Sequence, residues 1–118
     1  MKIRDLAVTL SLFLPLPAWA QQDISSGKYM YSACKALSEE SSDGNAFAKG
    51  LCAGIIDTIL DFAEVLPGNF RFCTPETSTL GQAAHVVVSY MNEHPESMDK
   101  SFKDLTATAL HAAWPCKN

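Results

Sequence analysis

Four cysteines, Cys34, Cys52, Cys73 and Cys116, carry the most easily defined chemistry in this sequence. A redox thiol pair would have two residues between its cysteines (Cys-x-x-Cys), and a zinc site would combine cysteines and histidines at short, regular spacings. Neither pattern occurs here. An even number of cysteines in a short chain with an export signal, described below, predicts two disulfides instead.

Histidines and acidic side chains could supply acid–base chemistry if the fold brought them together. The candidates are His85, His94, His111 and an acidic strip of Asp57, Asp61 and Glu64. Each has a simpler explanation, because helix ends favour an imidazolium and a solvated helix face favours acids. No phosphate-binding loop, nucleophile elbow or paired metal motif is present. The sequence therefore predicts no catalytic residue, metal or cofactor, and favours a binding protein over a small secreted enzyme.

The first 20 residues have the three parts of a secretion signal. Lys2 and Arg4 form a positive start, and the apolar run from Leu6 to Leu16 is too short to span a bilayer comfortably. Ala18-Trp19-Ala20 then gives the small-x-small pattern that signal peptidase requires. We therefore expect a signal peptide over residues 1–20, cleavage after Ala20 and a single mature domain over residues 21–118; an uncleaved anchor is the alternative.

The mature chain is acidic, with seven basic and twelve acidic residues once the signal is removed. A net negative surface argues against nucleic acid and anionic lipid as partners. No later segment is apolar enough to span a membrane. We expect neither nucleic-acid binding nor membrane attachment after cleavage, and the charge is compatible with a basic protein partner.

Apolar residues recur at helical spacing in four segments. They cover residues 27–40, 46–66, 79–94 and 101–114. Ser25 or Ser26 can cap the first, Thr79 with Gln82 forms a capping box for the third, and Ser101 with Asp104 does so for the fourth. Short polar loops separate the segments. The sequence predicts an all-α bundle of four helices, with a fifth as the alternative.

The second segment, residues 46–66, combines a broad apolar stripe with two glycines. Gly50 and Gly54 stand four residues apart and leave one side of the helix without bulk. A neighbouring helix is expected to approach closely on that side. Pro67-Gly68-Asn69 should end the helix.

The predicted arrangement of the helices favours one of the three possible cysteine pairings. If the first two helices form an antiparallel hairpin, Cys34 and Cys52 each lie about two turns from the connecting loop and face each other. Cys73 precedes the third helix and Cys116 follows the fourth, and these ends are neighbours in an antiparallel pair. We predict the bridges Cys34–Cys52 and Cys73–Cys116.

An ordered set of short motifs then identifies a family resemblance over Leu51 to Cys116. The motifs are Cys52-x-Gly54, Asp61, Phe72-Cys73-Thr74-Pro75, Thr79-x-Gly81-Gln82, Tyr90-x-x-x-His94-Pro95 and Ala109-Leu110-x-x-Ala113-Trp114-Pro115-Cys116. In this set the chain resembles the Rap/Tai family of type VI secretion immunity proteins. Ile55 and Thr58 depart from the family pattern, which commonly has an aromatic residue and a glycine at these positions.

The resemblance implies a periplasmic, helical and often dimeric protein. Members of the family bind a peptidoglycan amidase effector delivered by neighbouring cells and block its active-site cleft. The implied partners are therefore a cognate amidase and a second copy of the chain.

Loops held by a rigid scaffold are the expected recognition elements of such an inhibitor. Two loops are candidates for partner binding, one with Asp43, Gly44 and Asn45, the other with Pro67, Asn69, Phe70 and Arg71. Aromatic residues and arginine are favoured at interface centres. The alternatives are a plain turn for the first loop and a core-filling role for Phe70.

A different class of function fits the same general features. An exported, helix-rich chain with two disulfides is also similar to small periplasmic stress or acid chaperones. Such a protein would lose its dimer and expose apolar surface at low pH.

Overall fold

Side-chain caps fix where the first two helices begin. The computed structural model describes residues 23–117, so the predicted signal peptide and its cleavage site lie outside the described residues. Helix α1 spans Gly27–Ser38, and the Ser26 hydroxyl accepts a hydrogen bond from the Tyr29 backbone N–H. Helix α2 spans Ala46–Asp61, and the Asn45 side chain accepts one from the Ala48 N–H at 3.2 Å.

The same two helices end earlier than the sequence predicted. Helix α1 stops at Ser38, because Glu40 has a left-handed backbone with φ of 53° that no helix continues. Helix α2 stops at Asp61 rather than residue 66. Beyond it, the Ala63 and Val65 N–H groups bond carbonyls three residues back, so residues 62–66 form tight turns.

Helix α3 spans Leu80–Glu93 and begins with the predicted capping box. The Thr79 N–H donates to Gln82 Oε1 at 2.9 Å, while Thr79 Oγ1 accepts from the Gln82 N–H at 3.2 Å. After α3 comes a short 3₁₀ helix, η2, over Pro95–Asp99. The sequence pattern allowed a fifth helix as an alternative but did not indicate where it would lie.

Helix α4 spans Phe102–Ala113, but the predicted box of Ser101 with Asp104 is wrong, because the Ser101 side chain makes no capping hydrogen bond. Residues at the start of α1 fix the beginning of α4 instead. The Phe102 N–H donates to the Ser25 carbonyl at 2.6 Å, and the Gly27 N–H donates to the Lys100 carbonyl at 3.0 Å. The beginnings of α1 and α4 are thereby joined.

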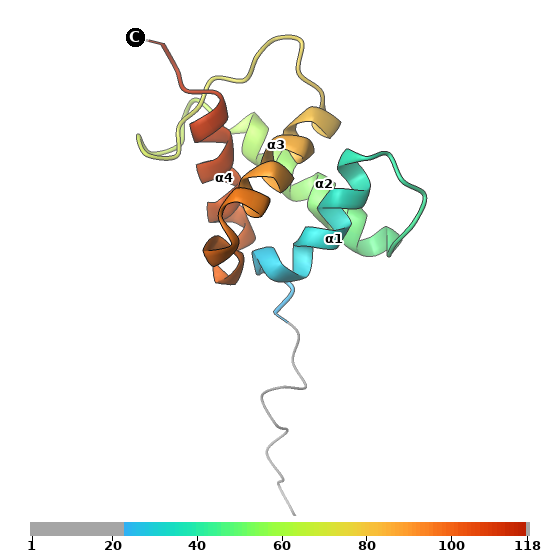
Figure 1. Cartoon of the computed structure of the whole chain (residues 1–118). Helices are drawn as coiled ribbons and strands as arrows, with labels where there is room; N and C mark the ends of the chain where they lie inside the picture. The colour runs from blue at the N-terminus through green and yellow to red at the C-terminus, as the bar shows by residue number, and fades with distance from the viewer. Residues whose placement is uncertain (1–22, 118) are drawn as a thin grey trace, which may run out of the picture.

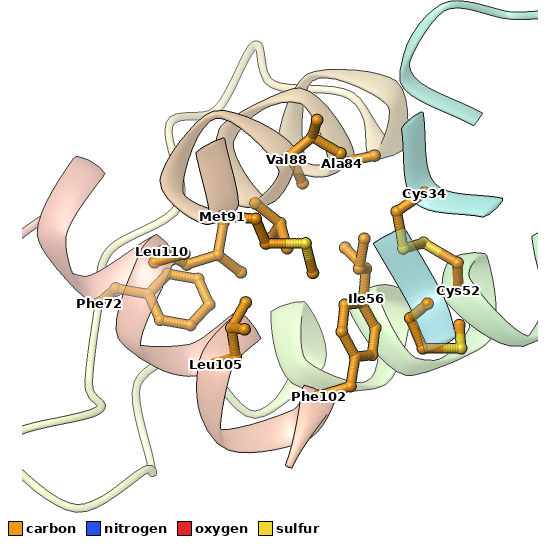
Figure 2. Packing of buried hydrophobic residues seen from close by; sticks show 14 of the residues in the cluster. Cys34, Cys52, Ile56, Phe72, Ala84, Val88, Met91, Phe102, Leu105 and Leu110 are labelled. Atoms are coloured by element: carbon orange, nitrogen blue, oxygen red, sulfur yellow. A yellow bond between two sulfur atoms is a disulfide. The ribbon is translucent and has the colours of Figure 1, made fainter. Parts of the chain in front are cut away.

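The described residues form an all-α fold in which α3 packs against α1, α2 and α4 (Figure 1). Its core is one continuous cluster of buried side chains. Figure 2 shows Ile56 of α2 next to the Cys34–Cys52 bridge, Met91 of α3 in the middle of the cluster and Leu105 of α4 on the side of Phe72. Phe72, from the segment between α2 and α3, fills the other end of the cluster.

Both predicted disulfides are confirmed. Cys34–Cys52 lies in the core and joins α1 to α2, with 5.6 Å between the Cα atoms. Cys73–Cys116 joins the two ends predicted to be neighbours, with 4.9 Å between the Cα atoms. Two covalent links therefore hold the α1–α2 hairpin and the far end of α4.

The expectation of a helix packed on Gly50 and Gly54 is wrong within the described chain. A Cβ atom added at either glycine would meet nothing within 4 Å. Both positions are exposed, so this side of α2 faces outward rather than toward α1 or α3.

Candidate partner-binding surface

The three histidines lie apart and make separate contacts. His94 Nδ1 lies 3.3 Å from Glu96 Oε1, and its ring lies against Tyr90 with centroids 4.2 Å apart. A hydrogen bond from its own backbone N–H, followed by the contact with His94, lowers the pKa of Glu96. This pair is exposed and lies at the start of η2.

His111 and His85 have different surroundings. His111 donates from Nδ1 to the Arg71 carbonyl at 2.6 Å and so ties α4 to the segment that follows α2. His85 is exposed on α3. Within residues 23–117, no three side chains of His, Cys, Asp or Glu come together in a way that could hold a metal ion.

The three acidic residues Asp57, Asp61 and Glu64 are all exposed. Asp57 and Asp61 lie on a solvated face of α2, which was the simpler of the two interpretations, whereas Glu64 lies in the turns that follow the helix.

Two residues of the 43–45 loop have local structural roles. Gly44 has a φ of 90°, a conformation that side chains disfavour, and Asn45 caps α2. The Asp43 N–H donates to Ser41 Oγ at 3.1 Å. All three residues of this loop are exposed, and Asp43 is the charged one.

The 67–71 loop is held by its own backbone and by α4. The Pro67 carbonyl accepts hydrogen bonds from the N–H groups of Phe70 and Arg71, at 2.8 and 2.9 Å. Asn69 and Arg71 are exposed, whereas Phe70 is half-buried beside Tyr90 and helps to line a cavity of about 210 Å³. Phe70 therefore combines packing with partial exposure, and Arg71 presents its side chain outward.

Trp114 lies partly at the surface, which the sequence pattern did not indicate. It is half-buried, its ring centroid lies 6.4 Å from that of buried Phe72, and its carbonyl accepts a hydrogen bond from the Cys73 N–H at 2.9 Å. These contacts place Trp114 close to the end of the 67–71 loop. The loop, yellow-green in Figure 1, projects from the body beside the C-terminal end of α4.

Trp114 also forms one wall of a groove along α3, which we call the α3 groove. The groove has a volume of about 610 Å³, and its lining includes Pro75, Ser78, Gln82, His85, Val86 and Trp114. A second hollow of about 280 Å³ shares His85 and Val86 and continues past Tyr90 toward α4. No spacing rule would find this groove, because its lining comes from segments far apart in the sequence.

The two predicted loops do not meet in one chain. They lie at opposite ends of α2, whose 16 residues span about 24 Å at 1.5 Å per residue. Figure 1 shows them on opposite sides of the molecule. The 67–71 loop instead shares its end of the molecule with Trp114, and the α3 groove extends from Trp114 to Ser38 and Glu40 at the end of α1.

A sequence model of the family described as Rap1a immunity proteins matches residues 26–116. The chain belongs to this family. The match begins at the α1 cap and ends at the last cysteine, so it covers both disulfides, both predicted loops and the α3 groove. No curated protein and no solved structure is detectably similar to the chain.

Family membership gives this Rap1a immunity protein a role in immunity, and hence in binding a cognate effector. The two disulfides and the family together support an extracytoplasmic protein. Among residues 23–117, no helix has both the length and the apolar character needed to cross a bilayer.

Proposed function

We propose that this protein is a periplasmic immunity protein that inhibits a peptidoglycan amidase effector of a type VI secretion system. The observation that carries the proposal is the family match over residues 26–116, on a scaffold with two disulfides. The resemblance of the sequence motifs to amidase immunity proteins supports the narrower identification of the effector.

The 67–71 loop is the proposed inhibitory element. It projects from the body (Figure 1), and its C-terminal end is anchored by the hydrogen bond from His111 to the Arg71 carbonyl and, two residues further on, by the Cys73–Cys116 bridge. An anchored loop loses little conformational entropy on binding, which favours tight inhibition. Arg71 and Trp114 lie at this end of the molecule, and both residue types are frequent among those that dominate binding energy.

The proposed site of action is the periplasm, reached through cleavage of a signal peptide over residues 1–20. An oxidising compartment is where both bridges would form and persist. The mature protein is proposed to be a homodimer, with no catalytic activity of its own. The Asp43–Asn45 turn is proposed as a second contact with the amidase, made through the charged side chain of Asp43.

The test combines mature protein, residues 21–118, with the amidase encoded in the neighbouring reading frame. Release of cleaved peptides from peptidoglycan fragments is measured against inhibitor concentration. We expect stoichiometric inhibition. Arg71→Glu should weaken inhibition by about 30-fold or more, the effect of losing about 2 kcal/mol at an interface hot spot.

Lys103→Glu is the matched control, because it makes the same charge reversal at an exposed position in the first turn of α4. It should leave inhibition unchanged. A wild-type protein that leaves the amidase fully active, together with deletion cells that resist their sister cells, would refute the proposed function.

A further inference from the structure

The α3 groove and the hollow that continues it form one long depression on the surface of α3. Their volumes are about 610 and about 280 Å³. Four residues of the helix line the depression at intervals of four positions, which makes a gently winding strip along α3: Gly81, His85, Ser89 and Glu93. The helix has 14 residues and spans about 21 Å at 1.5 Å per residue. We call the two hollows together the long groove.

Each end of the long groove carries a carboxylate. Glu40, two residues after the end of α1, lines the hollow at the beginning of α3, and Figure 1 shows these two helix ends side by side. Glu93, the last residue of α3, lines the other hollow. Both glutamates are exposed, and no lysine or arginine among residues 23–117 lines either hollow. The long groove therefore favours cations at its ends and disfavours anionic partners.

The walls between the two ends suit an extended chain. Trp114 and Val86 give the groove apolar surface, and Ala112 and Ala113 of α4 add little bulk. An extended chain turns alternate side chains to opposite sides, so that one set can pack on Trp114 while the other faces water. Seven extended residues cover about 20 Å at about 3.3 Å per step, which matches the length of α3.

The backbone at Glu40 carries a conformational cost. Among residues 23–117, Glu40 is the only residue other than glycine with a positive φ, of 53°. It ends α1 in a hydrogen-bond pattern that glycine usually completes. The Glu40 N–H donates to the Leu37 carbonyl at 3.2 Å, and the Ser41 N–H donates to the Ala36 carbonyl at 2.9 Å. A side chain is less stable than glycine here, which is typical of a residue that serves binding rather than stability.

We propose that the long groove binds an extended, basic segment of the cognate effector, about seven residues long, with one cationic side chain at Glu40 and another at Glu93. Arginine fits the Glu40 end best, because a planar guanidinium can pair with a carboxylate and stack on an aromatic face, and Trp114 lines the same hollow. The occupant is the effector because the family is one of immunity proteins.

This inference deepens the proposed function and rests on it for the identity of the effector. Trp114 connects the two surfaces, since it lines the long groove and lies close to the end of the 67–71 loop. The loop would meet the active-site cleft, and the groove would hold a separate basic segment of the same protein. Binding at the groove is therefore expected to be sensitive to salt, because the charges at its ends are exposed.

The first test measures binding of the mature protein, residues 21–118, to the amidase encoded in the neighbouring reading frame, by calorimetry at about 0.05 and about 0.5 M salt. Glu40→Gln keeps the size of the side chain and removes its charge. It should raise Kd about fivefold at low salt and less at high salt. Glu39→Gln is the matched control, because it removes the same charge one residue earlier, at an exposed position that lines neither hollow. It should leave Kd unchanged.

Glu40→Gly separates binding from stability. Glycine adopts the left-handed conformation of this position without the cost of a side chain, so Tm should rise by about 4 °C or more. The variant also lacks the carboxylate, so its Kd should rise as it does in Glu40→Gln. A fall in Tm, or unchanged binding in both variants, would show that Glu40 serves the turn and not a ligand.

A synthetic probe tests the groove without the amidase. The probe is a fluorescein-labelled peptide of about seven residues, with an arginine at each end and valine and serine alternating between them. Its counterpart has glutamate in place of both arginines. Fluorescence polarisation at low salt should show that the basic peptide binds at least about tenfold more tightly. A third peptide, with both arginines adjacent at its centre, has the same charge but cannot reach both glutamates and should bind more weakly than the first.

The outcomes for the groove and for the proposed function are distinguishable. Equal binding of the basic and acidic peptides, or equal weakening by Glu39→Gln and Glu40→Gln, would overturn the inference. If the wild-type protein still inhibits the amidase in that case, the proposed function stands. If the basic peptide binds in a manner that depends on Glu40 while no amidase is inhibited, the groove stands and the proposed function fails.

Discussion

Removal of the Cys73–Cys116 bridge tests both the stability of the fold and the role of the 67–71 loop. The sequence separation of this pair is 43, for which the loop-entropy relation gives about 4 kcal/mol at 25 °C. The Cys34–Cys52 pair has a separation of 18, and the relation gives about 3 kcal/mol. That pair is fully buried, so alanine replacement also removes two core sulfurs worth roughly 0.8 kcal/mol each. Both double-alanine variants should therefore lose about 4 to 5 kcal/mol.

The two double-alanine variants should be similarly destabilised but should differ in how well they inhibit the amidase. Cys73 lies two residues after the 67–71 loop, and its N–H donates to the Trp114 carbonyl. Cys73→Ala with Cys116→Ala should free the loop and weaken amidase inhibition at temperatures where the variant is still folded. Cys34→Ala with Cys52→Ala leaves that anchor intact and should inhibit as the wild type does.

Urea unfolding followed by circular dichroism measures the two stability losses, and amidase titration measures inhibition. A loss below about 1 kcal/mol for the Cys73–Cys116 variant would contradict the loop-entropy reasoning. Equal inhibition by both folded variants would show that the bridge does not position the 67–71 loop.

Three further changes separate structural roles from binding roles. Asn45→Ala removes the α2 cap and should lower the free energy of unfolding by about 1 kcal/mol without changing inhibition per folded molecule; a large loss of inhibition would make Asn45 a contact. His111→Ala removes the donor to the Arg71 carbonyl and should weaken inhibition more than its roughly 1 kcal/mol effect on urea unfolding explains. The pKa of Glu96 is lowered from 4.5 by its backbone hydrogen bond and then by His94, so its stabilising effect is present above pH 4.5 and is lost as the pH falls through the lower folded-state pKa. Thermal unfolding of Glu96→Gln should accordingly show a smaller loss of Tm below pH 4.5 than the wild type shows.

The starts of α1 and α3 were predictable because side-chain caps close in the sequence determine them, whereas the start of α4 is fixed by backbone contacts with Ser25 and Gly27. Thr79 and Gln82 satisfy each other's backbone N–H groups in the fold as in the sequence pattern. Both cysteine pairs followed from two antiparallel hairpins. The end of α2 was not predictable in the same way, because residues 62–66 continue the apolar pattern while their backbone turns so that Ala63 enters the core.

A binding surface is harder to predict from sequence than the fold, for a physical reason. Sequence shows that a helix face is apolar, but it does not show what covers that face. Leu51 and Phe62 suit a core stripe as well as they suit an outer face, and only the tertiary packing shows that Phe62 faces outward. The α3 groove was missed because Pro75, His85 and Trp114 meet only after folding.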